Sequence, residues 1–261
     1  MKVKEIVDYI EGVYPTDLAM DFDNVGLLVG SGDAQVGKIL ISLDPSFAAI
    51  NYAIDSGVDL LLTHHPLMIR PIQSITDQDG VGRKLLSLIQ NNVAFYALHT
   101  NYDVLRMAEI VGEKFALTNT KVLLETALFN QQPVGLGIIG DLPGKTNLGE
   151  FCQVIKNRFD ISNVKVFGDV TKPIDTIAIS PGSGRSVVQA ALAAGVDVLV
   201  TGDIGHHDGL DSKESGMAIV DAGHYATEAI FLRDMELFLQ GIGDDKPEVI
   251  VYDSNQPFLM I

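Results

Sequence analysis

Histidines are rare in this chain of 261 residues, and each of the six follows a predicted buried strand or the turn after one. They lie in LTHHPL (His64 and His65), ALHTNYD (His99), TGDIGHHDG (His206 and His207) and DAGHYATE (His224). Open α/β sheets bind ligands outside the carboxyl ends of their strands. The imidazoles are therefore concentrated where an α/β protein would build a site.

The adjacent pair His64 and His65 precedes Pro66, which cannot extend a central strand, so the strand is expected to end there. Consecutive side chains of a strand point to opposite faces. The two imidazoles therefore either converge on one metal ion beyond the strand end or diverge onto two neighbouring ions. The alternative is an ordinary polar turn that binds no metal.

Two carboxylates accompany these histidines. His224 and Glu228 in GHYATE are four residues apart, so a helix that begins here and runs to Leu239 would place both on one face, where they can hold one cation. The alternative is an exposed His–Glu pair of small energetic value. Asp103 in HTNYD precedes a helical pattern, so it can be an N-cap, a metal ligand or both.

Taken together, these residues form a mixed set of nitrogen and oxygen ligands, namely His64, His65, Asp103, His224 and Glu228. Five ligands exceed what one structural zinc ion needs, and they suit two divalent ions that share a bridging water. We therefore predict two divalent metal ions per chain as cofactors. Imidazole and carboxylate ligands suit Zn, Fe, Mn, Co and Ni, so the identity of the metal stays open.

Other polar residues near these strings are candidates for catalysis. His99 is close in sequence to Asp103 and is predicted to orient it or to shuttle a proton. His207 is a second catalytic candidate, with His206 and Asp203 beside it. The turn PGSGR (181–185) either presents backbone N–H groups and Arg185 to an anion or is simply a tight strand-to-helix turn.

The elements that must position these residues alternate between apolar strands and amphipathic helices. The pattern predicts strands over 36–44, 58–63 and 93–98, with helices over 46–57, 80–92 and 104–117. A different stretch, from about 120 to 172, contains two long strands, a helix and a short strand. The alternation then restarts, which indicates an α/β fold with mixed, largely parallel sheets.

The restart repeats the beginning of the chain. AIDSGVDLLLT (53–63) matches ALAAGVDVLVT (191–201) at an offset of 138, with six identities in eleven positions. Two parallel strand–helix units can resemble each other merely because both bury Val and Leu. The shared AxxxGVDxLxT string goes beyond that requirement and favours an internal duplication. We predict a first module over residues 1–125 and a second over 126–261.

Composition limits the function. Eighteen Lys and Arg against thirty-four Asp and Glu give a net charge of −16, which disfavours nucleic acid and anionic membranes as partners. The single cysteine, Cys152, rules out a disulfide within the chain and a Cys-rich zinc site. It lies within an amphipathic helix, where we expect it to be buried as a small hydrophobic residue. The N-terminal segment has helical apolar spacing instead of the apolar run of a signal peptide, so we expect a cytoplasmic protein.

The ordered set of strings resembles the Nif-three-like family, also described as dinuclear-metal-centre hexameric proteins and as GTP cyclohydrolase I type 2 homologues. DFDNVGLLVG (21–30) is similar to the family's WDNVGLQVG, with Phe22 where Trp is usual, and LTHHPL, HTNYD, PGSG, TGD and GHYATE follow in the family's order. The resemblance implies two intertwined, duplicated α/β modules in a toroidal homohexamer. It also implies the metal ligands His64, His65, Asp103, His224 and Glu228.

The function implied by this resemblance is a metal-dependent hydrolase of the GTP cyclohydrolase type, with GTP as the substrate. A chain of charge −16 repels GTP at long range, but two bound cations would reverse the sign of the potential locally. Two alternatives stay open. One is a non-enzymatic metal-binding assembly or regulatory protein, and the other is a binuclear phosphoesterase.

Overall fold

The computed structural model describes residues 1–243 and 245–259, and it divides the chain into two compact units. Unit 1 comprises residues 1–102 together with the segment from Phe231 onward, and unit 2 comprises residues 103–230. The chain thus leaves unit 1, builds unit 2 and returns to unit 1. The strand Thr118–Phe129 is continuous across residues 125 and 126. The modules over 1–125 and 126–261, which rest on the sequence repeat, stay a prediction.

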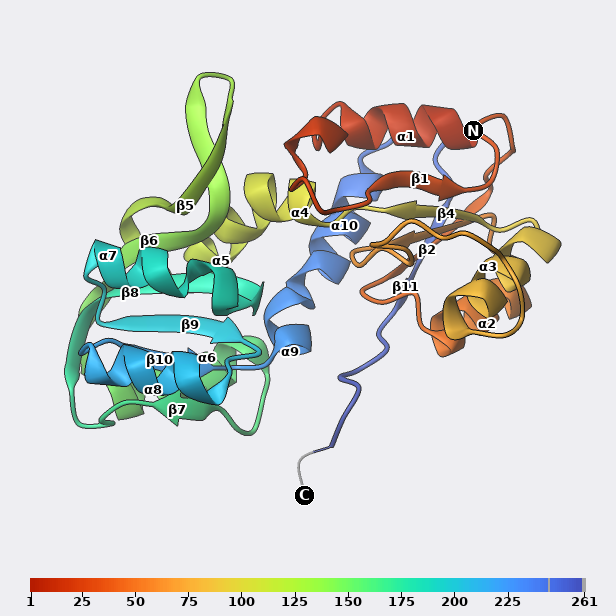
Figure 1. The fold of residues 1–261 in the computed structure, drawn as a ribbon. Helices are drawn as coiled ribbons and strands as arrows, with labels where there is room; N and C mark the ends of the chain where they lie inside the picture. The colour runs from red at the N-terminus through yellow and green to blue at the C-terminus, as the bar shows by residue number, and fades with distance from the viewer. Residues whose placement is uncertain (244, 260–261) are drawn as a thin grey trace. The chain divides into compact units, whose positions relative to one another are not determined.

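Unit 1 is built on a sheet with the strand order β1-β4-β3-β2-β11 (Figure 1). β2 pairs in parallel with β3 and β11, and β3 pairs in parallel with β4, whereas β1 is antiparallel to β4. The strands are β1 (Gly26–Val29), β2 (Lys38–Ser42), β3 (Leu60–Thr63), β4 (Ala94–Ala97) and β11 (Glu248–Tyr252). The helices are α1 (Val3–Glu11), η1 (Thr16–Leu18), α2 (Phe47–Asp55), α3 (Gly80–Gln90), α4 (Thr100–Tyr102) and α10 (Ile230–Gln240).

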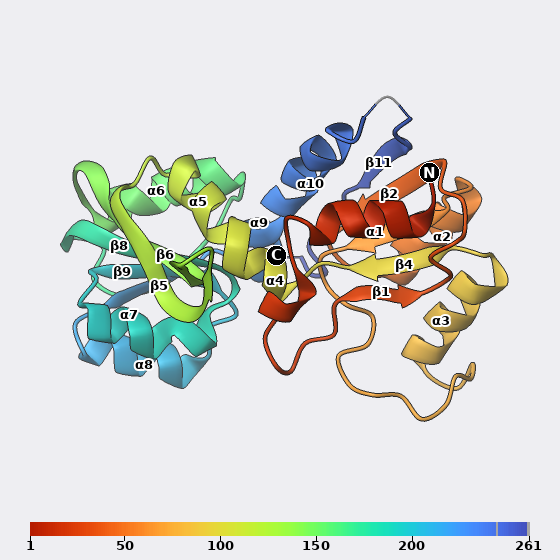
Figure 2. The same ribbon diagram turned by 90° about the horizontal axis from the view of Figure 1, so that it is seen from above.

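Helices cover both faces of this sheet (Figure 2). On one face, α2 and α3 bury their apolar sides against the strands, as Ile50 and Leu88 do against Leu61. On the other face lie α1 and α10, where the rings of Tyr9 and Phe238 pack with centroids 4.9 Å apart. Both faces of β2, β3 and β4 are therefore buried, which explains their near-continuous apolar sequences.

Unit 2 is built on a sheet with the order β5-β6-β8-β9-β10-β7, in which β8, β9 and β10 are parallel and the other pairs are antiparallel. The strands are β5 (Thr118–Phe129), β6 (Gln132–Asn147), β7 (Lys165–Phe167), β8 (Pro173–Ser183), β9 (Val198–Gly202) and β10 (Ala218–Asp221). The helices are the π-helical η2 (Asp103–Met107), α5 (Ala108–Lys114), α6 (Leu148–Phe159), the 3-10 helix η3 (Gly184–Val187), α7 (Val188–Ala194), α8 (His206–Glu214) and α9 (His224–Glu228).

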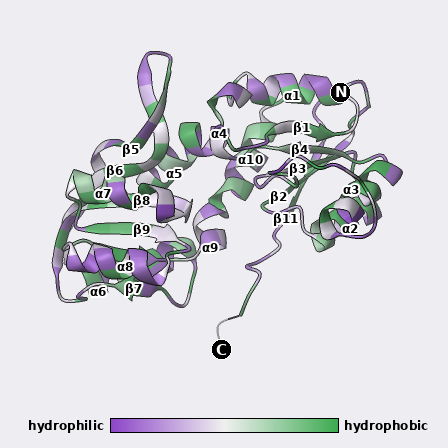
Figure 3. Cartoon of the chain, viewed as in Figure 1, coloured by the Kyte–Doolittle hydropathy of each residue, from purple (hydrophilic) through white to green (hydrophobic). Residues whose placement is uncertain are grey.

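The sheet of unit 2 also lies between helix layers, with α5 and α6 on one face and α7 and α8 on the other (Figure 2). The strands are largely hydrophobic, whereas α8 is largely hydrophilic (Figure 3). Cys152 on α6 is buried in the first of these cores, as its amphipathic helix predicted. This burial raises the pKa of its thiol.

The duplication is visible in topology and in register. The order β1-β4-β3-β2 of unit 1 recurs as β7-β10-β9-β8 in unit 2, with the same parallel and antiparallel pairings. Ile39 pairs with Leu60, and at the offset of 138 Ile177 pairs with Val198. The α/β prediction and the repeat inferred from the sequence are thus confirmed.

One hydrogen-bond arrangement, in which an Asp carboxylate accepts from two backbone N–H groups, recurs at the offset of 138 residues. The Asp59 carboxylate accepts hydrogen bonds from the N–H groups of Gly37 and Lys38, at 2.8 and 3.0 Å. Asp197 accepts from Asp175 and Thr176 at 2.9 and 3.2 Å. Each Asp precedes one parallel strand and satisfies N–H groups at the start of the neighbouring strand.

Two local expectations are corrected. The helix predicted to run from His224 to Leu239 is interrupted at Ala229, which separates α9 from α10. Helical structure begins at Thr100, ahead of Asp103, so Asp103 is not an N-cap. Throughout residues 1–243 and 245–259, every helix falls short of the length or the apolar character that a membrane span requires.

We expect Asp59→Ala to lower the free energy of unfolding by about 1 kcal/mol, because two backbone N–H groups lose their acceptor at the sheet end. Urea denaturation followed by circular dichroism measures this change. Asp21→Ala, at an exposed position, is the control. An equal loss in both variants would contradict the bracing role of Asp59.

Candidate metal-binding clusters

The parallel pairing of β3 with β4 brings three histidines of unit 1 together. Thr63 at the end of β3 pairs with Ala97 at the end of β4, so His64 and His65 emerge beside His99. One ring nitrogen from each of the three imidazoles lies within 4.8 Å of the others. We call these three residues the His64 cluster.

The hydrogen bonding of His64 identifies which of its nitrogens can bind a metal. His64 is fully buried, and its Nδ1 lies 2.9 Å from the carbonyl oxygen of Leu98. Because a carbonyl only accepts hydrogen bonds, Nδ1 carries the proton. Nε2 is then the nitrogen with the lone pair, which is the form of imidazole that ligates metals.

The other two members of this cluster are held by carboxylates. His65 Nδ1 donates to Asp44 Oδ1 at 2.8 Å, and His99 Nδ1 donates to Asp23 Oδ1 at 2.9 Å. Histidines that bind metals usually make this contact through the second ring nitrogen, because it fixes the tautomer and the ring orientation. In all three residues Nε2 therefore carries the lone pair, which can bind a metal ion or accept a proton.

Asp23 is the most deeply buried of these carboxylates, with a side chain that is 0% exposed. Burial alone would raise its pKa. The hydrogen bond and charge of His99, with two hydrogen bonds from Thr100, instead lower the pKa of Asp23 well below its usual range. Asp23 therefore stays ionised and remains an acceptor for His99. The neighbouring Phe22, at the position of the family's Trp, is 59% exposed.

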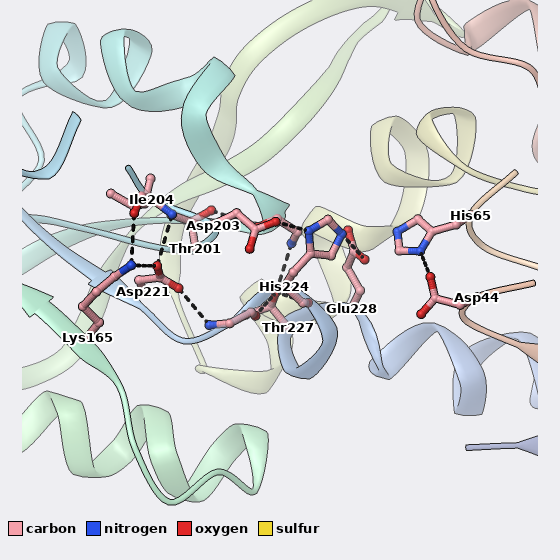
Figure 4. Close-up of polar contacts among 12 residues, drawn as sticks. Asp44, His65, Lys165, Thr201, Asp203, Ile204, Asp221, His224, Thr227 and Glu228 are labelled. Carbon is pink, nitrogen blue, oxygen red and sulfur yellow. Dashed lines mark hydrogen bonds and ion pairs between the residues drawn. The ribbon is translucent and has the colours of Figure 1, made fainter. Parts of the chain in front are cut away.

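In unit 2, His224 and Glu228 lie one helical turn apart on α9, as their spacing predicted. His224 Nε2 is 2.9 Å from Glu228 Oε2, and His224 Nδ1 is 2.7 Å from Asp203 Oδ2 (Figure 4). We call these three residues the His224 cluster. An imidazole between two carboxylates needs a positive charge, which either a second ring proton or a metal ion at Nε2 and Glu228 can supply.

Glycine at position 182 is a requirement of this cluster. A Cβ atom built on Gly182 would lie 2.0 Å from Glu228 Oε1 and 3.6 Å from His224 Nε2. Gly182 also has φ +70°, in the left-handed region that side chains disfavour. Its N–H donates to Thr227 Oγ1 at 3.0 Å, which ties the turn to α9. The turn PGSGR therefore makes room for Glu228.

The remaining predicted residues are placed as follows. Asp103 is half-buried and begins the π-helical turn η2, a type of irregularity that is frequent at functional sites. His207 is exposed on the first turn of α8, where its ring packs on His206. The structure does not group His207 with His224 and Glu228. The side chain of Arg185 is 80% exposed and lies 3.7 Å from Asp208.

The donors of both clusters fit a divalent transition metal ion. Imidazole nitrogens with fixed tautomers, together with a carboxylate, are the ligands that zinc, iron, manganese, cobalt and nickel share. The His64 cluster supplies nitrogen donors, and the His224 cluster supplies nitrogen and oxygen donors. The predicted ligand set draws on residues of both units, whereas each cluster lies within one unit. The set as a whole therefore stays a prediction.

The orienting carboxylates Asp23 and Asp44 escaped the sequence analysis. Asp23 stands in the DFDNVGLLVG string that carries part of the family resemblance, and Asp44 follows a predicted strand directly. Asp203 was a candidate only for catalysis. For Asp44 and Asp203, the signal in the sequence was a carboxylate directly after a strand. That signal does not reveal which imidazole the carboxylate contacts.

Comparisons with known proteins agree with the fold and the motifs. The family model described as Duf34/NIF3 (NGG1p interacting factor 3) matches residues 1–257. A protein of Clostridium perfringens named GTP cyclohydrolase 1 type 2 homolog is 32% identical over 268 residues, covering 100% of each chain.

Solved structures show the same fold over nearly the whole chain. A Bacillus cereus protein related to NIF3 matches with a TM-score of 0.91 at 23% identity, covering 100% of this chain and 99% of its own. Reduced HcgD from Methanocaldococcus jannaschii matches with a TM-score of 0.81 at 35% identity, covering 96% and 97%. On its sequence and its fold, this chain belongs to the Duf34/NIF3 family.

Proposed function

We propose that this chain binds two divalent metal ions through His64, His65, Asp103, His224 and Glu228. We further propose that it is a metal-dependent hydrolase of the GTP cyclohydrolase type. The observation that carries the proposal is the hydrogen bonding of the imidazoles. In the His64 cluster and in His224, each Nδ1 is held by an oxygen acceptor, which leaves Nε2 as the ligand nitrogen.

Bound divalent ions would polarise a substrate group and lower the pKa of a water molecule toward neutrality. The chain's own contribution is to orient donors and to move protons. His99 rests on the ionised Asp23, so its Nε2 can accept a proton while Asp23 stabilises the resulting imidazolium. We therefore assign general acid–base catalysis to His99 and metal binding to His64 and His65.

GTP is the substrate to test first, because curated relatives are named GTP cyclohydrolase 1 type 2 homologs. Bound cations would offset the negative charge of the chain where a nucleotide enters. The proposal includes assembly into a homohexamer, as the family resemblance implies. A non-enzymatic metal-binding role and a phosphoesterase activity are the competing outcomes of the experiments below.

We expect protein purified without added metal or chelator to carry about two transition-metal ions per chain. Glu228→Gln should lose about one of them, because the amide is a much weaker ligand than the carboxylate. Inductively coupled plasma mass spectrometry measures both contents. The matched control is Glu109→Gln, an exposed helix residue that pairs with Arg106.

Full metal content in Glu228→Gln would remove Glu228 from the ligand set. If the wild-type protein holds no metal, even after reconstitution with Zn, Mn, Fe and Co, the hydrolase proposal fails. Bound metal without turnover of GTP or of phosphoesters would favour the non-enzymatic role.

His99→Ala is expected to lower GTP turnover by at least ~100-fold while leaving the metal content unchanged, because a general base is lost and no ligand is removed. Asp23→Asn should lower turnover in the same direction, since the carboxylate that fixes the His99 tautomer is gone. Chromatographic detection of GTP loss, with metal analysis of the same samples, tests both. Parallel loss of metal and activity in His99→Ala would make His99 a ligand.

Gly182→Ala should displace Glu228 and reduce metal binding at the His224 cluster, because the added Cβ overlaps the carboxylate. The left-handed φ of Gly182 adds a strain of ~1 kcal/mol to the variant. Gly195→Ala is the control, since Gly195 has φ +68° and no heavy atom lies within 4 Å of a Cβ built there. Equal metal affinity in the two variants would show that Gly182 serves the backbone turn alone.

A further inference from the structure

Asp221 ends β10 and touches both flanks of the His224 cluster without belonging to it. Its Oδ2 accepts a hydrogen bond from Ile204 N–H at 3.1 Å, and its Oδ1 accepts one from Gly223 N–H at 3.1 Å (Figure 4). Ile204 directly follows Asp203, and Gly223 directly precedes His224. One carboxylate, only 9% exposed, thus holds the neighbours of both partners in the Asp203–His224 hydrogen bond.

Lys165 on β7 completes this brace. Its ammonium lies 2.8 Å from Asp221 Oδ2 and also donates to the carbonyl oxygen of Ile204 at 3.0 Å. Both backbone polar groups of Ile204 are therefore fixed by one ion pair. The ion pair also supplies the charge that a nearly buried carboxylate needs.

The brace acts on a segment that would otherwise resist its conformation. Asp203 has φ +55°, a left-handed conformation that is rare for residues other than glycine. The preceding Gly202 approaches so closely that a Cβ there would lie 2.6 Å from His224 N. Fixing Ile204 holds Asp203 in this turn, and the turn places the Asp203 carboxylate 2.7 Å from His224 Nδ1.

The duplicated half of the fold manages without this ion pair. In unit 2, Asp221 pairs with Lys165 across β10 and β7, whereas the topologically equivalent pair across β4 and β1 is Ala97 with Gly26. The sheet geometry therefore does not require charges at these positions. In unit 2 the charged pair stands at the strand end that leads to His224.

We propose that Asp221, paired with Lys165, is a positioning residue that aligns Asp203 with His224 and so prepares His224 to bind metal. The metal part of this inference rests on the proposed function. The alignment of His224 by Asp203 is a property of the metal-free protein, so that part of the inference does not depend on the proposed function. Partners that orient metal-binding histidines typically change metal affinity by about 10- to 100-fold when removed.

The first test measures Zn²⁺ affinity by competition with a chromophoric chelator. Asp221→Asn should weaken the affinity of the His224 cluster by about 10- to 100-fold. The matched control is Asp197→Asn, because Asp197 also accepts two backbone N–H groups and lies 3.6 Å from Lys172, but at the opposite ends of the strands. We expect Asp197→Asn to lower the melting temperature and to leave Zn²⁺ affinity unchanged.

The second test reads the imidazole directly in metal-free protein, by nitrogen-15 NMR of labelled histidines with His224→Ala to assign the signal. In the wild type, Nδ1 of His224 should show the signal of a protonated nitrogen that donates to Asp203, while Nε2 faces Glu228. Asp221→Asn should shift the Nδ1 signal toward that of a solvent-exposed imidazole, because Asp203 is no longer held against it. If Asp221→Asn fails to fold, Lys165→Gln serves instead, since it keeps the Asp221 carboxylate and removes the ammonium that contacts Asp221 and the Ile204 carbonyl oxygen.

The outcomes separate the two proposals. Unchanged His224 signals in a folded variant would overturn the positioning role, whatever the metal content. Absence of Zn²⁺ binding in the wild type would overturn the proposed function, while the NMR comparison would still decide the role of Asp221. A loss of affinity in Asp197→Asn equal to that in Asp221→Asn would show a general effect of stability.

Discussion

The hydrogen bond from Nδ1 of each imidazole to an oxygen acceptor is the interaction on which the proposed chemistry depends. It selects one tautomer in advance, so that no reorganisation of the ring is needed when a cation arrives. The acceptors differ in kind, being a backbone carbonyl for His64 and carboxylates for His65, His99 and His224. The carboxylates also place negative charge behind the imidazoles, which favours a cation in front of them. The main role of the strand ends, turns and glycines is to place these oxygen acceptors beside the imidazoles.

The duplication shows how one scaffold carries two sets of donors. The turn after β3 contributes His65, and at the offset of 138 the turn after β9 contributes Asp203. The first residue is a predicted ligand, whereas the second orients His224. Conversely, Asp44 orients His65, and its counterpart at the same offset is Gly182, which makes room for Glu228. The two halves share their backbone register, but equivalent positions have different roles. A position that supplies a predicted ligand in unit 1 supplies an orienting carboxylate in unit 2.

The sequence predicted much of this organisation. Apolar runs and amphipathic periods located the helices and the main strands, because burial on both faces leaves an unmistakable pattern in strands such as β3. The i, i+4 spacing of His224 and Glu228 predicted their contact, since helix geometry is local. Asp23 is different, because it lies 76 residues before His99 and their contact depends on the packing of a loop. The break at Ala229 and the bounds of the compact units likewise depend on tertiary structure.

The return of the chain to unit 1 has a consequence for biosynthesis. Unit 2 is one continuous segment, so it can fold as soon as residue 230 has left the ribosome. Unit 1 must wait for α10 and for β11, which pairs with β2 over Glu248–Tyr252. Until then β2 presents an open, apolar edge that can pair with other chains. The nascent protein therefore completes its inserted part first, and its unit 1 depends on a segment that is made after unit 2.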